Sequence, residues 1–325
     1  MNKTKSMKKN GEFSFIHRFF EPLAGKTAWK LGDDAAALPD LERGKEFVVS
    51  VDNLAENVHF FTDDPPQFVA QKLLRRNLSD MVAMGAKPTG YFLSLAFNPE
   101  KFEVEAWFKA FQEGLRLDQK IYDFSLLGGD TTVIKGDLFL SVTIVGEVEK
   151  EHLLHRKGAQ VGDELWVTGT IGNAALGLAG REGRITALEA VFDKFYLLPQ
   201  PPVGFLIGDL ASSGMDVSDG LLQDAGHLSE ASSVQVLLDI SKIPLLPEAQ
   251  KYFKDFSDLI LSGGDDYQLL FTIAPEHVLE MKTRAAEHHI QVSRIGGIAE
   301  GGGVTLLNAC GKEELYQQKG GWNHF

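Results

Sequence analysis

Aspartates beside glycine or serine recur along this chain, and they are the side chains best suited to support chemistry. The segment LGDDAAAL places Asp33 and Asp34 between a glycine and an apolar run. An unpaired charge near a packed core costs roughly several kcal/mol unless a partner offsets it. Five further motifs repeat the pattern: SVDN (Ser50, Asp52), NLSDM (Asp80), GGDTT (Asp130), MDVSDG (Asp216, Ser218, Asp219) and SGGDDYQLLF (Asp265, Asp266).

Each motif also has an ordinary structural interpretation. Asp33 and Asp34 fit a solvated turn, and Asp80 falls in the last turns of the helix expected over 68–84. A carboxylate there opposes the helix dipole, and a cation partner would resolve that conflict. The other simple interpretations are a strand end for Asp52, a turn for Asp130 and a helix cap for Asp219, with the helix starting near Leu221.

The residue types favour Mg²⁺ as the cation. Hard oxygen ligands without nearby cysteine or paired histidine are typical of magnesium sites rather than zinc or copper sites. The chain has no CxxC or HExxH motif, and the EF-hand pattern fails around 216–220. Because the carboxylates are scattered along the sequence, we expect ions held jointly by the protein and by the phosphates of a ligand.

Two glycine-containing turns resemble phosphate cradles. The GKT at 25–27 imitates the end of a P-loop, but Phe20 occupies the place of the leading glycine and no strand precedes it. In VTGTIGNAALG, Gly169 and Gly172 lie between a strand and a helix, where backbone N–H groups could meet a phosphate. A routine tight turn is the favoured interpretation of this second segment.

The elements that must position these residues alternate between strand-like and helix-like patterns, which predicts a mixed α/β fold in both halves. A polar, turn-rich segment at 150–162 predicts a boundary between domains 1–150 and 151–325. Arg75 and Arg76 on the long helix are expected to be surface charges, with the alternative that one of them faces a cleft. Strands are expected at 46–51, 91–97, 137–148, 233–240, 267–273, 291–298 and 302–308, helices at 67–85, 101–117 and 275–289, and a strand–turn–helix unit at 164–180.

Composition excludes several classes of protein. The chain has 325 residues, enough for two domains. Its net charge of −13 argues against sequence-independent binding to nucleic acid. Its single cysteine, Cys310, cannot form an intramolecular disulfide, which fits a reducing compartment. No run approaches the roughly 20 apolar residues that span a bilayer. We therefore expect a soluble cytoplasmic protein with small-molecule partners.

The ordered set of motifs resembles the thiamine-monophosphate kinase family. The resemblance is collinear from residue 11 to residue 325, so its specificity comes from the order rather than from any single motif. It rests on GEF, GDDAA, VDNLAENVHF, NLSDMVAMGAKP, GGDTT, HRKGAQVGD, DVSDGLLQDAGHL, SGGDDYQLLF and the terminal GWNHF.

The resemblance implies the two-domain α/β (α+β) fold of aminoimidazole ribonucleotide synthetase. It implies that the N-terminal domain, 1–150, binds ATP and Mg²⁺ and closes a β-barrel with its mate in a homodimer. The C-terminal domain, 151–325, would complete the cleft. The implied reaction is transfer of the γ-phosphoryl group of ATP to thiamine monophosphate, which gives thiamine diphosphate.

The same resemblance implies residue roles. The implied magnesium ligands are Asp34, Ser50, Val51, Asp52, Asp80, Asp130, Asp216 and Asp219. The implied nucleotide contacts are Gly129, Asp130, Arg156 and Ser218, and the implied substrate contacts are His59, Asp265 and Trp322.

Two departures from the family pattern keep an alternative open. Val51 stands where relatives often carry threonine and offers only its backbone carbonyl, and Asp265 replaces the usual glutamate with a side chain one methylene shorter. The alternative is a non-catalytic ATP- and Mg²⁺-binding sensor of the same fold. Selenide water dikinase, hydrogenase-maturation relatives and aminoimidazole ribonucleotide synthetase itself are disfavoured, because their reactive cysteine, terminal cysteine or DGVGTK-type stretch is absent.

Overall fold

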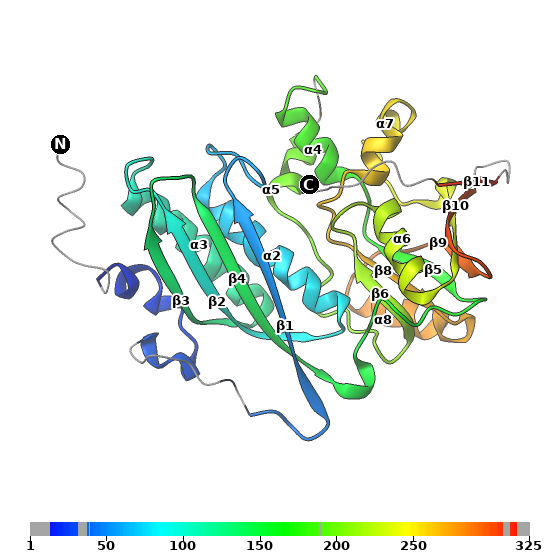
Figure 1. Ribbon diagram of the computed structural model, residues 1–325, viewed down its shortest axis with the longest axis horizontal. Coiled ribbons are helices and arrows are strands. Elements are labelled where there is room, and N and C mark those ends of the chain that lie inside the picture. The colour runs from blue at the N-terminus through cyan, green and yellow to red at the C-terminus, as the bar shows by residue number, and fades with distance from the viewer. Residues whose placement is uncertain are drawn as a thin grey trace. The chain divides into compact units, whose positions relative to one another are not determined.

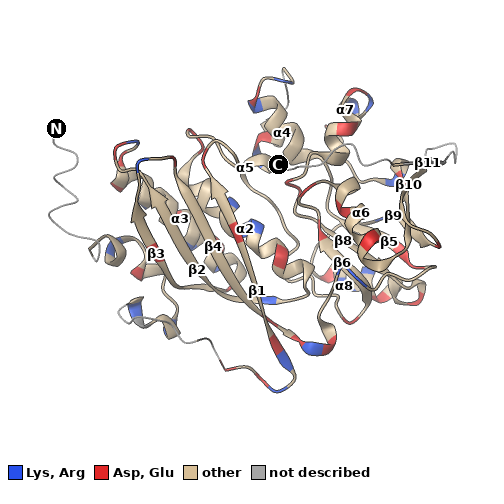
Figure 2. Cartoon of the chain, viewed as in Figure 1, with Lys and Arg blue, Asp and Glu red and all other residues tan. Residues whose placement is uncertain are grey.

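The structure, a computed structural model, describes residues 14–31, 38, 40–186, 188, 190–307 and 313–316. The described chain divides into two compact units. The first runs to Leu78 and resumes at Lys87–Val148, and the second takes Ser79–Ala86 and the chain from Glu149 onward. Figure 2 shows that acidic and basic residues are interspersed on both units. No helix in the described ranges is long and apolar enough to cross a membrane.

The first unit is a four-stranded sheet whose strands follow the order β1-β4-β2-β3. Figure 1 shows α2 and α3 together on one face of this sheet. Strand β2 pairs antiparallel with β4 and parallel with β3, so β1 and β3 form the two edges. The elements are β1 (Lys45–Ala55), α2 (Pro66–Ala83), β2 (Lys87–Phe97), α3 (Val104–Tyr122), β3 (Ser125–Val133) and β4 (Phe139–Glu149), with 3-10 helices η1 (Glu21–Leu23) and η2 (Lys26–Leu31).

Helical periodicity explains how the first unit builds its core. In α3, Phe108, Phe111 and Leu115 recur on one face and are fully buried. The Phe108 ring packs edge-on against Phe97 at 4.9 Å between centroids. Gly114 is required between the helices, because a Cβ there would overlap the carbonyl oxygen of Gln67.

The second unit is a seven-stranded sheet in the order β11-β10-β7-β9-β5-β8-β6, and two apolar clusters pack against it. In β5, Leu165 and Val167 join one apolar cluster while Trp166 joins another, as the two-residue period of a strand requires. The elements are β5 (Glu164–Thr168), α4 (Asn173–Arg181), α5 (Ala190–Leu197), β6 (Ala211–Asp216), α6 (Leu221–Ser232), β7 (Gln235–Asp239), α7 (Gln250–Ser262), β8 (Leu269–Ile273), α8 (Val278–Glu287), β9 (Val292–Ala299), β10 (Gly303–Leu307) and β11 (Glu313–Leu315), with 3-10 helices η3 (Lys150–His152), η4 (Ile240–Lys242) and η5 (Pro275–His277).

The mixed α/β architecture expected from the sequence is confirmed in both units. The expectation that Arg75 and Arg76 are surface charges is wrong. Arg75 is 4% exposed and donates from Nε and Nη2 to the fully buried Asp118, at 2.8 and 3.0 Å. The Arg76 side chain is 13% exposed. A charge can be buried at this depth only when a partner of opposite sign is buried with it.

Candidate functional site

The residues expected to support chemistry fall into two groups, one in each compact unit. The first unit carries Ser50, Val51, Asp52, His59, Gly129 and Asp130, and the second carries Asp80, Arg156, Asp216, Ser218, Asp219 and Asp265. Asp33, Asp34 and Trp322 lie outside the described residues.

Strand β1 carries three of the expected magnesium ligands in succession. Asp52 lies inside the strand rather than at its end, and its backbone N–H donates to Asn77 Oδ1 at 3.2 Å. The Asp52 carboxylate lies 3.9 Å from Arg76 Nε, so buried positive charge stands beside it. The Val51 side chain is 56% exposed. Residues 50–52 therefore offer side-chain and backbone oxygen atoms next to the guanidinium of Arg76, an arrangement that suits binding of a charged ligand.

His59 follows β1 in a tight turn. The ring Nδ1 of His59 accepts the backbone N–H of Ala55 at 3.0 Å, and the backbone N–H of His59 donates to the Ala55 carbonyl at 2.9 Å. The ammonium of Lys72, a side chain 2% exposed, donates to the His59 carbonyl at 3.1 Å. In the neutral ring the proton therefore resides on Nε2, which makes that nitrogen a hydrogen-bond donor.

Gly129 and Asp130 lie within β3, not in a turn. They pair in register with Leu93 and Ser94 of β2, and a Cβ at position 129 would overlap the Leu93 carbonyl oxygen. Asp130 is exposed, and the Thr132 hydroxyl lies 3.4 Å from its Oδ2. Since two strands separate β1 from β3, the two edges of the sheet lie about 14 Å apart. One sheet thus keeps Asp52 and Asp130 at opposite edges.

In the second unit, Asp216 ends β6 and is 5% exposed. The hydroxyl of Ser79, in the last turns of α2, donates to Asp216 Oδ2 at 2.9 Å. Asp80 is the next residue of the same helix, as expected from the helical pattern. The structure therefore brings the NLSDM and MDVSDG motifs together, although 137 residues separate the two bonded side chains.

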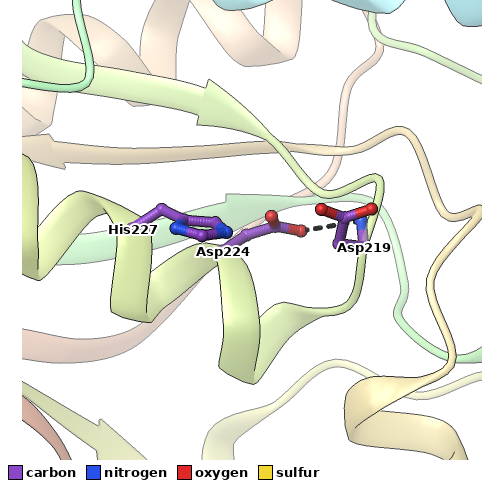
Figure 3. A group of neighbouring side chains, drawn as sticks. All are labelled: Asp219, Asp224 and His227. Carbon is purple, nitrogen blue, oxygen red and sulfur yellow. Dashed lines mark hydrogen bonds between the residues drawn. The ribbon is translucent and has the colours of Figure 1, made fainter. Parts of the chain in front are cut away.

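Asp219 belongs to a cluster with Asp224 and His227, two residues that sequence reasoning missed (Figure 3). Ligand atoms of the three side chains lie within 4.8 Å of one another. Asp224 Oδ2 accepts the backbone N–H groups of Asp219 and Gly220, both at 3.1 Å, and so holds the turn that leads into α6; the N-cap residue is Gly220, not Asp219. Burial, followed by the charges of Asp216 and Asp219, raises the pKa of Asp224 to about 8.

Ser218 and Asp265 lie side by side in the same unit. The backbone N–H of Asp265 donates to the Ser218 carbonyl at 2.9 Å. Arg156 is exposed, and its carbonyl accepts the Ser232 hydroxyl at 3.0 Å. Asp216, Ser218 and Asp265 thus lie together at the carboxyl end of β6, and Asp80 directly follows Ser79, which contacts Asp216.

The glycine turn before α4 meets a carboxyl group supplied by the chain itself. Gly172 N–H donates to both carboxylate oxygens of Asp266, at 3.0 and 2.8 Å. Asp266 is 7% exposed, and burial raises its pKa to about 8 although N–H donation lowers it. Because this carboxylate occupies the helix N-terminus, the routine structural turn favoured for Gly169 and Gly172 agrees with the structure.

Comparisons with known proteins point to one family. Residues 32–148 match the N-terminal domain of AIR synthase related proteins, and residues 160–307 match their C-terminal domain. The chain is 37% identical to a thiamine-monophosphate kinase of Caulobacter vibrioides, over 96% of this chain and 90% of that protein.

Two solved structures have similar folds. A thiamine-monophosphate kinase from Stenotrophomonas maltophilia superposes with a TM-score of 0.78 at 35% identity, over 85% of this chain and 89% of that one. AaThiL, complexed with AMPPCP and TMP, gives a TM-score of 0.76 at 30% identity over 98% of both chains.

Proposed function

This chain belongs to the thiamine-monophosphate kinase family of AIR synthase related proteins, and from that membership we propose that it phosphorylates thiamine monophosphate with ATP. The observation that carries the proposal is a 37% identity that extends over 96% of the chain, so the relationship covers both domains. AaThiL was solved in complex with AMPPCP and TMP, and this supports the proposal that a protein of this fold can bind a nucleotide and a second phosphorylated ligand together.

We propose that the carboxylates of both units hold Mg²⁺. The donor set is made of oxygens, which fits a hard divalent cation. When bound, Mg²⁺ offsets the negative charge that builds up on the transferring phosphoryl group. The residues proposed to hold it are Asp34, Ser50, the Val51 carbonyl, Asp52, Asp80, Asp130, Asp216 and Asp219.

Nucleotide and substrate would meet the remaining residues. Arg156, exposed and with its carbonyl bonded to the Ser232 hydroxyl at the end of α6, is suited to clamp a phosphate. His59 Nε2, as a donor, is suited to a substrate phosphate oxygen. The full proposed set is Gly129, Asp130, Arg156 and Ser218 for ATP, with His59, Asp265 and Trp322 for thiamine monophosphate.

The transfer needs no strong general base in this proposal. The acceptor is a phosphate whose second pKa is about 6, so it is already a nucleophile near neutral pH. What this chain supplies is position and electrostatics: Arg156 and, through bound Mg²⁺, the carboxylates would orient two polyanions for direct in-line transfer without a phosphoenzyme.

A homodimer accounts for the exposed sheet of the first unit. Its face opposite α2 and α3 and its edges leave apolar side chains in solvent, with Val49 58%, Val51 56%, Val133 60% and Phe139 41% exposed. We propose that the sheet of a second copy closes a β-barrel with this one, so that 1–150 serves ATP binding and dimerisation while 151–325 completes the cleft. Since β1 and β3 are the two edges, closure through unlike edges pairs β1 of one protomer with β3 of the other, and this is the arrangement that we propose.

One assay separates this function from a non-catalytic sensor. Purified protein is mixed with ATP and Mg²⁺, with and without thiamine monophosphate, and ADP is followed by a coupled enzyme assay while mass spectrometry identifies the product. We expect ADP release that depends on thiamine monophosphate, yields thiamine diphosphate and stops on addition of EDTA. Tight ATP binding without substrate-dependent ADP release would instead support the sensor. We propose that the protein works in the cytoplasm, which is a reducing compartment, so the assay uses reducing buffer at neutral pH.

A further inference from the structure

The loop between α7 and β8 holds an unusual backbone path. Gly264, Asp265 and Tyr267 all have positive φ, at 71°, 62° and 52°. This region is unfavourable for side chains with a Cβ. Only glycine fits at 264, because a Cβ there would overlap the Ser218 carbonyl oxygen. Two non-glycine residues in this short loop have left-handed backbone, which is unfavourable for them. Such a conformation persists only where surrounding contacts stabilise it, so the side chains of this loop are held in defined positions.

Backbone hydrogen bonds anchor this loop to the MDVSDG segment. Asp265 N–H donates to the Ser218 carbonyl at 2.9 Å, and Tyr267 N–H donates to the Val217 carbonyl at 2.8 Å. In return, Val217 N–H donates to the Gln268 carbonyl at 2.8 Å. The two segments belong to the same compact unit, so Asp265 is held at a defined place beside Ser218.

The side chains of the loop have separate partners. The Tyr267 hydroxyl donates to Asp265 Oδ1 at 2.8 Å, and Tyr267 is 2% exposed whereas Asp265 is half-buried. The adjacent Asp266 accepts Gly172 N–H instead. An O–H donor to a carboxylate forms one of the stronger hydrogen bonds in proteins, and a buried tyrosine ring has little rotational freedom. The hydroxyl therefore restricts the orientation of the Asp265 carboxylate.

We propose that Tyr267 is a positioning residue for the phosphate acceptor, acting through Asp265. Its hydroxyl holds the Asp265 carboxylate in the orientation that receives the ring portion of thiamine monophosphate, which carries a cationic thiazolium and, on its pyrimidine, an amino group that can donate to a carboxylate. This proposal rests on the proposed function. A short aspartate side chain has few rotamers to lose, so a single hydroxyl is enough to preorganise it before the substrate arrives.

A double-mutant cycle on Tyr267→Phe and Asp265→Ala tests the role. Tyr267→Phe keeps the buried ring and removes only the hydroxyl. We expect the KM for thiamine monophosphate to rise about tenfold, which corresponds to about 1.4 kcal/mol, while the KM for ATP changes less than twofold. In the Asp265→Ala background, Tyr267→Phe should have no further effect. The matched control is Tyr196→Phe, a tyrosine of α5 that is 3% exposed, and it should leave both constants unchanged.

Each other outcome decides against the proposal. Equal increases in both KM values, or effects of the two substitutions that simply add, would assign Tyr267 to the fold alone. Wild-type protein that neither binds nor phosphorylates thiamine monophosphate would overturn the proposed function, and the role of Tyr267 with it. If Tyr267→Phe does not fold, a crystal structure of wild-type protein with thiamine monophosphate decides: we expect Asp265 in contact with both Tyr267 Oη and the substrate, and an Asp265 turned away from either overturns the proposal.

Discussion

Asp216 and Asp224, two carboxylates near the end of β6, accept hydrogen bonds from different kinds of donor. Asp216 accepts the Ser79 hydroxyl, whereas Asp224 accepts two backbone N–H groups at the start of α6. Burial and nearby negative charge raise the pKa of Asp224 to about 8, which favours its neutral form. A neutral Asp224 supports the Asp219 loop without adding repulsion, which leaves Asp216 as the better candidate for a charged ligand position.

Removing the charge of Asp216 should weaken metal use without unfolding the protein. Asp216→Asn retains an oxygen that can accept from Ser79 Oγ but cannot supply a negative ligand. We expect kcat to fall by about a hundredfold or more and the Mg²⁺ concentration for half-maximal activity to rise. Steady-state kinetics over a Mg²⁺ titration measures both. Asp255→Asn, an exposed change in α7, serves as the control, and an unaltered Mg²⁺ dependence in Asp216→Asn would argue against a metal role.

Some residues of the candidate site could be identified from the sequence, and others could not. The candidates near β6 were identifiable because each aspartate stood beside glycine or serine at an element edge. Asp224 and His227 were missed, since their spacing of three within a helical pattern is equally typical of a solvated helix face. Arg75 was misjudged for a related reason: its partner Asp118 lies 43 residues away, and only the packing of α2 on α3 shows that both are buried.

At the scale of elements, the start of α4 is secured by a residue from a distant loop. Asp266 lies 94 residues from Gly172, yet both its carboxylate oxygens accept the N–H of that residue. A helix N-terminus favours negative charge, but the near-complete burial of Asp266 opposes it. Burial prevails, and the pKa of Asp266 rises to about 8.

This raised pKa gives stability a defined pH dependence. The folded state holds a proton on Asp266 that the unfolded chain, with a carboxyl pKa near its ordinary value of 3.8, releases above about pH 4. The stabilising contribution of this proton is complete below pH 4 and is lost as the pH rises toward 8. Asp266→Asn should flatten that decline, so Tm measured by calorimetry should fall less between pH 5 and pH 8 than in wild type. Asp255→Asn should retain the wild-type slope; identical slopes in all three proteins would rule out Asp266 as the source.

Most elements with clear periodicity could be predicted, and β3 could not. The helix expected over 67–85 is α2 (Pro66–Ala83), and the strand expected over 91–97 is the end of β2 (Lys87–Phe97). The β3 sequence SLLGGDTTV contains two adjacent glycines and little alternation, which is typical of a turn. It is a strand because β2 pairs with it along eight residues, an interaction that local sequence does not encode.

At the scale of the whole molecule, the second unit covers both faces of its sheet, whereas the first covers one. Apolar clusters lie on each side of β5, but the β1-β4-β2-β3 sheet leaves Phe139 41% exposed. An apolar, open-edged sheet in solvent tends to associate. The first unit is therefore where a second copy is expected.

Phe139→Asp should disrupt that association. Burying an unpaired carboxylate in an interface is strongly unfavourable, so we expect light scattering coupled to size exclusion to give the chain mass of 35.7 kDa instead of twice that value. Leu279→Asp, at a leucine of α8 that is 78% exposed, should leave the dimer intact. A wild-type protein that is already monomeric at micromolar concentration would refute the proposed barrel.

The opposite-edge placement of Asp52 and Asp130 has a genetic consequence. If β1 of one protomer meets β3 of the other, each metal site takes Asp52 from one chain and Asp130 from its partner. A hybrid dimer of one Asp52→Asn chain and one Asp130→Asn chain then has one site with both substitutions and one site with neither. Two inactive alleles would then rescue each other. Random reassortment makes half of the dimers hybrids, so co-expressed chains should recover about a quarter of normal turnover; centres built within one chain would recover none.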